Sequence, residues 1–144
     1  MFISIIVAGW LADKALQKGI SATAIRKTAQ TIGLVGSAIF LVIAGSASNT
    51  LIAIITTCSA LSCLGFCYAG FAPAVLEMSP RYGEVIFGIS NTFGTVPGII
   101  GVAITGWLVE LTGTYLAAFA LTACVHILGA LAWLIFGTAS KVID

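Results

Sequence analysis

The stretch VIFGISNTFGTVPGIIGVAITGWLV, from Val85 to Val109, contains no charged side chain. As a helix it is long enough to cross the hydrocarbon core of a bilayer, for which about 20 mostly apolar residues are needed. Three further stretches share this character, at about residues 31–49, 51–76 and 115–137, and none of the four contains Lys or Arg. The sequence therefore predicts an all-α polytopic membrane helix bundle in which residues 1–144 form a single transmembrane region.

The composition supports this prediction. Hydrophobic residues make up 60% of the chain and charged residues 8%, whereas an ordinary soluble domain is about 45–50% apolar and about 25% charged. So little polar surface requires lipid as the main solvent, and the lipid bilayer is the first expected partner. The net charge is +1 and no basic patch is present, so nucleic-acid binding is not expected.

The first apolar run, residues 1–12, is too short to span a membrane by itself. No positive charge precedes it and no small-x-small cleavage site follows it cleanly, which argues against a signal peptide. We interpret it as a partial span, the second half of a helix. The chain is therefore expected to be a fragment, or a gene model started at an internal Met.

The basic residues are distributed on one side of the predicted membrane. A polar loop at about 13–28, the segment EMSPRYGE at 77–84 and the C-terminal tail carry all six Lys and Arg residues, and the two opposite connections carry none. Since positive residues favour the cytoplasmic side, we expect the 13–28 loop and the C-terminus to be cytoplasmic. Which cellular membrane holds the protein stays open.

Small and polar residues form a stripe on the predicted helix at 85–109. Asn91, Gly94, Gly98 and Gly101 are separated by three or four residues, so they share one helix face. Such a face lets another helix approach closely, and Pro97 favours a kink. One interpretation is a static, tightly packed helix. The other is a helix that bends or slides during transport and presents polar groups to a cavity.

Three polar side chains in this helix, Ser90, Asn91 and Thr95, are candidates for lining a substrate pathway. The alternative for Asn91 is a hydrogen bond to a neighbouring helix. His126 is a candidate for proton coupling, because a titratable group inside a membrane span is functional by default. The alternative is a neutral histidine bonded to a backbone carbonyl.

Charges flank the first connection of the chain. Asp13 follows the partial span, and Arg26 and Lys27 precede the next one. A carboxylate and a guanidinium at facing helix ends can hold two helices together on one side of the membrane, so these three residues are a candidate cytoplasmic gate or latch. The alternative is ordinary loop charges that follow the positive-inside rule.

No catalytic motif and no phosphate-binding loop is present in the sequence, so we do not predict an enzyme. The four cysteines, Cys58, Cys63, Cys67 and Cys124, lie in apolar runs. Cys63 and Cys67 have the spacing of a metal pair, but small polarizable packing residues are the favoured interpretation. We therefore predict no metal site.

The stretch GWLADKALQKGISATAIRKTAQTIG, residues 9–33, resembles a signature of the major facilitator superfamily. The matching positions are Gly9, Leu11 and Asp13, and later Arg26 and Lys27. The expanded loop and the following helix start (Gln30, Ile32, Gly33) resemble the anion:cation symporter branch, which includes sialin, vesicular glutamate carriers and sodium- or proton-linked phosphate carriers.

A second block, SPRYGEVIFGISNTFGTVPGIIG at residues 79–101, resembles the Pro-Arg-Tyr, Gly-Ile-Ser-Asn and Gly-Thr run of the same branch. Weaker similarities are Val125-His126 and Phe136-Gly137-Thr138. The branch often has a His and an Asp ahead of the Pro-Arg-Tyr, where this chain has Val75 and Glu77.

The resemblance implies a twelve-helix fold of which this chain forms part of helix 8 and helices 9–12, with helices 1–7 as the missing partner. It implies a C-terminal fragment of a secondary active transporter. The substrate class would be small organic anions or inorganic phosphate, moved by alternating access and coupled to H⁺ or Na⁺, with no other cofactor. The alternative is a non-transporting membrane protein, or pseudo-transporter, that acts as a helix-packing partner.

Overall fold

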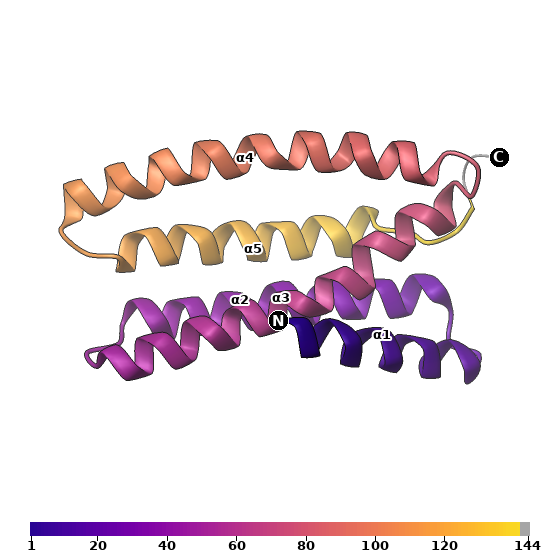
Figure 1. Ribbon diagram of the computed structural model, residues 1–144, viewed down its shortest axis with the longest axis horizontal. Coiled ribbons are helices and arrows are strands. Elements are labelled where there is room, and N and C mark those ends of the chain that lie inside the picture. Colours follow the sequence, from indigo (N-terminus) through magenta and orange to yellow (C-terminus); the bar gives the residue numbers. More distant parts are fainter. Residues whose placement is uncertain (142–144) are drawn as a thin grey trace.

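The computed structural model describes residues 1–141, which form five helices and no strand (Figure 1). The helices are α1 (Phe2–Gln17), α2 (Ala22–Gly45), α3 (Thr50–Met78), α4 (Gly83–Thr112) and α5 (Leu116–Phe136). Helices α2 to α5 are long and apolar enough to cross a membrane, by length and composition. The predicted all-α bundle with four full spans is therefore confirmed.

The expected loop at 13–28 is wrong in its extent. Helix α1 continues to Gln17 and α2 begins at Ala22, so only residues 18–21 connect them. Gly19 turns the chain with φ +80°, a conformation that favours glycine. The Ser21 hydroxyl then accepts a hydrogen bond from the Ala24 N–H at 3.4 Å and caps α2. The polar residues of this stretch are mostly the ends of the two helices.

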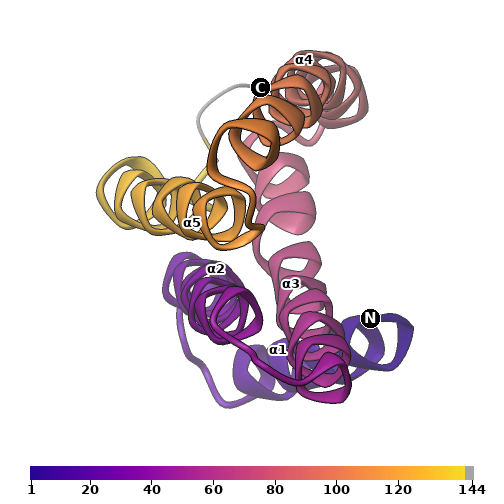
Figure 2. The same ribbon diagram turned by 90° about the vertical axis from the view of Figure 1, so that its left-hand side faces the viewer.

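Helix α2 lies between α3 and α5 and runs antiparallel to both (Figures 1 and 2). The residues that α2 contacts show these antiparallel arrangements. Gly33 lies against Cys67 of α3, whereas Leu34 lies against Gly129 of α5 and Gly45 against Leu116. Helix α1 packs against both α3 and α2, since Ala8 lies together with Ala29 of α2 and Ala69 of α3. Most of the helix contacts therefore involve α2 or α3.

The interior consists of small residues. Of the buried hydrophobic side chains nearly all are alanines, among them Ala8, Ala29 and Ala69, which pack together. Such small side chains allow the backbones of neighbouring helices to approach one another closely.

The closest approach is between α2 and α3. A methyl group on Gly33 would overlap the Cys67 sulfur, and one on Gly36 would lie 3.0 Å from the Cys63 sulfur. These two cysteines are therefore packing residues, as the favoured interpretation had it. Cys58 and Cys124 are exposed, and all four thiols are free.

Helix α4 stands apart from the rest of the bundle (Figure 2). Near its start, Gly83 packs against Leu76 of α3 and the Phe87 ring lies 5.6 Å from that of Phe71. Residues 91–100 are all exposed, and the helix continues through Pro97 without interruption. A bend at Pro97 stays a prediction.

The small-residue face of α4 meets no other helix of the described chain. A methyl group on Gly94, Gly98 or Gly101 would have no atom within 4 Å. Close glycine contacts between helices of the described chain occur instead elsewhere, for example at Gly33 of α2 and at Gly65 and Gly70 of α3. That the α4 glycines pack against a helix outside residues 1–141 stays a prediction.

The basic residues gather at one end of the bundle, as predicted. The last turn of α1, the α1–α2 connection, the first turns of α2, the α3–α4 connection and the segment after α5 lie at the same end (Figure 1). Together they carry the six Lys and Arg residues. We call this the basic end. The C-terminus itself, residues 142–144, lies outside the described residues, and the cytoplasmic orientation stays a prediction.

Candidate functional site

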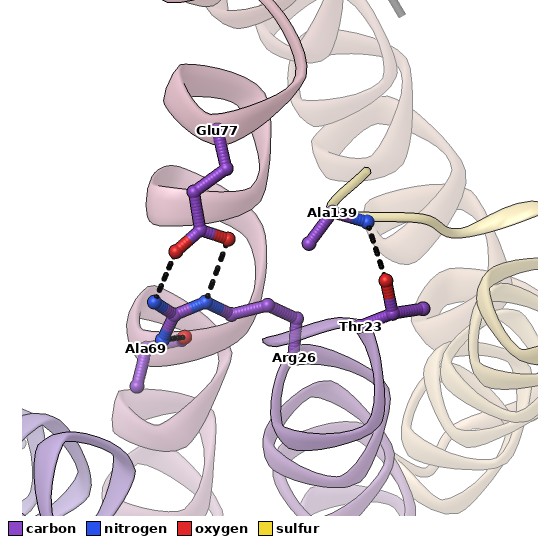
Figure 3. Close-up of polar contacts among 5 residues, drawn as sticks. All are labelled: Thr23, Arg26, Ala69, Glu77 and Ala139. Atoms are coloured by element: carbon purple, nitrogen blue, oxygen red, sulfur yellow. Dashed lines mark hydrogen bonds and ion pairs between the residues drawn. The ribbon is translucent and has the colours of Figure 1, made fainter. Parts of the chain in front are cut away.

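A polar junction lies at the basic end, where two turns of α2 bind both neighbouring helices (Figure 3). Its centre is Arg26, which is 6% exposed. The guanidinium binds Glu77 of α3 through two hydrogen bonds, from Nη2 to Oε1 at 2.6 Å and from Nε to Oε2 at 3.3 Å. A buried arginine needs such a partner, because an unpaired charge away from water is strongly unfavourable.

The third contact of Arg26 is to the backbone. Its Nη1 donates to the Ala69 carbonyl at 3.0 Å. In a regular helix this carbonyl would accept from the N–H four residues later, but that residue is Pro73, which has no N–H. Arg26 therefore supplies a donor that the sequence of α3 lacks.

Two other residues of this part of α2 bind the last turn of α5 and the segment that follows it. Lys27 Nζ donates to the Leu134 carbonyl at 2.7 Å, and the Ala139 N–H donates to the Thr23 hydroxyl at 3.1 Å. The Leu134 carbonyl is in the last turn of α5, where carbonyls have no partner within the helix. A cation is favourable there because it also meets the negative end of the helix dipole. The polar junction thus joins α2 to α3 and to α5.

Only some of the contacts expected for the predicted latch are present, and a gating role for Asp13, Arg26 and Lys27 stays a prediction. Arg26 and Lys27 do join helices at the basic end, but within the described chain Asp13 forms no ion pair. Asp13 is exposed and, with Arg26, Tyr68 and Pro73, lines a pocket of about 270 Å³. The partner of Arg26 is Glu77.

This partner was missed because Glu77 was taken as the first residue of a loop. Helix α3 in fact runs to Met78, which brings Glu77 to the level of Arg26. A signal was available in the sequence, since Glu77 stands one turn after a proline and a proline leaves a carbonyl without its donor.

No protein-family model matches the chain. It is 31% identical over 96% of its length to the probable anion transporter 4, chloroplastic, of Oryza sativa. It is 32% identical over its whole length to the sodium-dependent phosphate transport protein 1, chloroplastic, of Arabidopsis thaliana. The voltage-gated purine nucleotide uniporter SLC17A9 of Mus musculus is 30% identical over 94% of the chain.

This chain is a homologue of the anion transporters. The resemblance to the anion:cation symporter branch of the major facilitator superfamily is thereby confirmed. The chain spans about a quarter of the length of the relatives it matches. It covers 23% of the rice protein and 28% of the Arabidopsis protein.

The candidate pathway residues of this transporter homologue lie on α4. The Thr95 hydroxyl donates to the Asn91 carbonyl at 3.0 Å, one turn back in the same helix, so its polar group is satisfied locally. Asn91 is exposed and Ser90 half-buried, and the side chain of Asn91 has no hydrogen bond within residues 1–141. The interhelical hydrogen bond considered for Asn91 is therefore not made to the described part of the chain.

His126 lies half-buried on α5. Its Nδ1 is buried and has no hydrogen-bond partner among the described residues. The alternative of a bond from this nitrogen to a backbone carbonyl is thus not observed. Its role in proton coupling stays a prediction.

Proposed function

We propose that this chain forms one part of a secondary active transporter that moves small organic anions or inorganic phosphate by alternating access, coupled to H⁺ or Na⁺. The observation that supports the proposal is the homology to proteins named as anion and phosphate transporters, which extends over the whole chain. The four helices long enough to span a membrane agree with it.

The polar groups of α4 support a location of this helix beside the substrate pathway. Pro97 removes the donor for the Phe93 carbonyl, and Asn91 is exposed six residues before Pro97. In hydrocarbon an unsatisfied amide or carbonyl costs several kcal/mol, so such groups face protein or water. These polar groups of α4 therefore border a water-filled cavity or a facing helix of the transporter.

The charge distribution supports an orientation. The basic end carries all six Lys and Arg residues, and short loops rich in these residues stay on the cytoplasmic side. The polar junction then lies at the cytoplasmic end of the homologue.

A chimera tests the transport function. The matching segment of the Arabidopsis phosphate transporter is exchanged for this chain, and the chimera is reconstituted in proteoliposomes. We expect uptake of phosphate, ascorbate or ATP that depends on an imposed Na⁺ or pH gradient. The intact Arabidopsis protein is the positive control. A chimera that is inserted and monodisperse, yet takes up none of the three, would contradict the proposal.

A second experiment uses the chain by itself. We expect proteoliposomes of the chain alone to show no gradient-driven uptake above empty vesicles, because alternating access needs a second body to close the pathway and the polar face of α4 is open. Uptake by the chain alone would contradict this expectation.

The alternative function, a non-transporting packing partner, also has an observation in its favour. The open small-residue face at Gly94, Gly98 and Gly101 is of the kind that admits another helix closely. A chimera without uptake, together with stable co-purification of the chain with an intact transporter, would favour this alternative.

A further inference from the structure

The three hydrogen bonds of Arg26 lie on both sides of Pro73 (Figure 3). Ala69 precedes the proline by one helical turn and Glu77 follows it by one turn. One guanidinium therefore connects the part of α3 before the proline to the part after it. Arginine suits this task because its planar fork offers five N–H donors in fixed directions.

Pro73 is the point at which α3 is weakest. A proline inside a helix removes one backbone hydrogen bond and crowds the carbonyl of the preceding turn, and sharp bends of helices occur at such residues. At this point α3 lacks the backbone hydrogen bond from residue 73 to the Ala69 carbonyl that a regular helix would have.

We propose that Pro73 is a hinge in α3 and that Arg26 is a releasable staple across it. With the staple in place, Arg26 binds Ala69 and Glu77 together and α3 is held in the conformation seen here. With the staple released, the segment 74–78 can swing relative to the rest of α3. Arg26 is in this proposal a positioning residue, which acts through α3.

The pocket beside the staple gives Arg26 a place to go. It measures about 270 Å³, and Arg26 and Asp13 both line it. The guanidinium could not leave Glu77 for an apolar site, because a buried charge without a partner is strongly unfavourable. The Asp13 carboxylate offers the compensating charge, and this assigns Asp13 and Glu77 as alternative partners of one arginine.

Movement of the segment 74–78 would be transmitted to α4. Leu76 packs against Gly83, where a methyl group would lie 3.0 Å from the Leu76 Cα and Cδ2 atoms. The start of α4 therefore follows the end of α3. That this movement opens or closes a pathway beside α4 rests on the proposed function, whereas the hinge itself does not.

Hydrogen exchange of the full chain in lipid nanodiscs tests the hinge, because backbone amides exchange when the structure opens locally. Arg26→Gln is expected to speed exchange of the amides of residues 74–78 and to leave those of residues 55–65 unchanged. Pro73→Ala restores the backbone donor for the Ala69 carbonyl. The double variant is therefore expected to exchange more slowly at 74–78 than Arg26→Gln alone.

Lys27→Gln is the matched control, since Lys27 neighbours Arg26 but binds α5; it should leave exchange at 74–78 as in the parent chain. If Arg26→Gln fails to fold, Arg26→Lys takes its place, because a single ammonium cannot hold both acceptors in the same geometry. Unchanged exchange at 74–78, or a Pro73→Ala change that does not reduce the effect, would overturn the hinge.

These outcomes are separable from those of the proposed function. Faster exchange that Pro73→Ala suppresses supports the staple even where the chimera takes up no anion. Conversely, an active chimera with unchanged exchange in the Arg26 variant supports transport and rejects the staple.

Discussion

Gly33 of α2 faces Cys67 of α3 so closely that a methyl group on the glycine would overlap the cysteine sulfur and lie 3.0 Å from its backbone nitrogen. Since the second of these atoms is backbone, a change of side-chain rotamer cannot relieve the contact. The α2–α3 interface is therefore set by the absence of a side chain at this position.

A first prediction concerns this interface. Gly33→Ala should destabilise the chain by about 1–3 kcal/mol, the usual cost of overpacking. The matched control is Gly98→Ala on α4, where the added methyl group has no atom within 4 Å. It should be neutral or stabilise the helix by roughly 0.5–1 kcal/mol. Thermal unfolding in one detergent, followed by circular dichroism, measures both. Equal stability of the two variants would contradict the packing described for Gly33.

A second prediction concerns the ion pair of Arg26 and Glu77. Removal of one partner leaves an uncompensated charge, so Arg26→Met or Glu77→Met should each cost on the order of 3 kcal/mol, the lower end for buried pairs, because Glu77 is 31% exposed. The double variant should cost less than the sum of the two. Unfolding free energies of all four proteins complete the cycle, and additive losses would show that the two residues are not coupled.

A further prediction concerns Asp13, the carboxylate that the sequence placed opposite Arg26. Asp13 makes no ion pair in the described chain, so Asp13→Asn should leave the unfolding free energy nearly unchanged, as most surface substitutions do within about 0.5 kcal/mol. A large loss of stability in this variant would favour the latch between Asp13 and Arg26 that the sequence had suggested.

The spans were predictable because hydropathy over a long window is a strong signal. The helix containing Val85–Val109 lies at 83–112, and the spans predicted at 51–76 and 115–137 lie at Thr50–Met78 and Leu116–Phe136. The span predicted at 31–49 is displaced, because its helix runs from Ala22 to Gly45. The helix ends were not predictable from this signal. Arg26 is polar and was placed in a loop, yet it belongs to α2, since Ser21 caps the helix one turn earlier.

The site was only partly predictable, for a related reason. Arg26 and Lys27 could be selected as charges at a helix end, but their partners depend on how α2 packs between α3 and α5. Lys27 binds the backbone carbonyl of Leu134. Every residue has such a carbonyl, so the amino-acid sequence does not indicate which one is the partner. The small-residue stripe of α4 meets no helix of residues 1–141, so its packing against another helix stays a prediction.

A third prediction concerns the contact between α2 and α5. Lys27→Met should weaken the attachment of the end of α5 to α2 by about 0.3–1 kcal/mol, which is the stabilisation that a cation provides at an exposed helix C-terminus. The effect should shrink in high salt, which screens exposed charges. Limited proteolysis after Phe136 measures it, with Lys18→Met as a control at an exposed position of the α1–α2 connection. Equal proteolysis of the two variants would contradict the role of Lys27.

A fourth prediction concerns the pathway and uses the chimera with the Arabidopsis transporter. Asn91→Ala should impair anion uptake while membrane expression is unchanged, if the exposed amide faces the substrate cavity. Val102→Ala is the matched control, because Val102 is exposed on the same helix and carries no polar group. It should leave uptake unchanged.

The ratio of uptake to expression decides between the two interpretations of Asn91. In a packing role its loss would remove an interhelical hydrogen bond, and such bonds within membranes are worth about 0.6 kcal/mol on average. That loss would lower the amount of folded protein and leave uptake per molecule intact. A lower uptake per molecule at unchanged expression is therefore the signature of a pathway residue, whereas lower expression with normal uptake per molecule assigns Asn91 to packing.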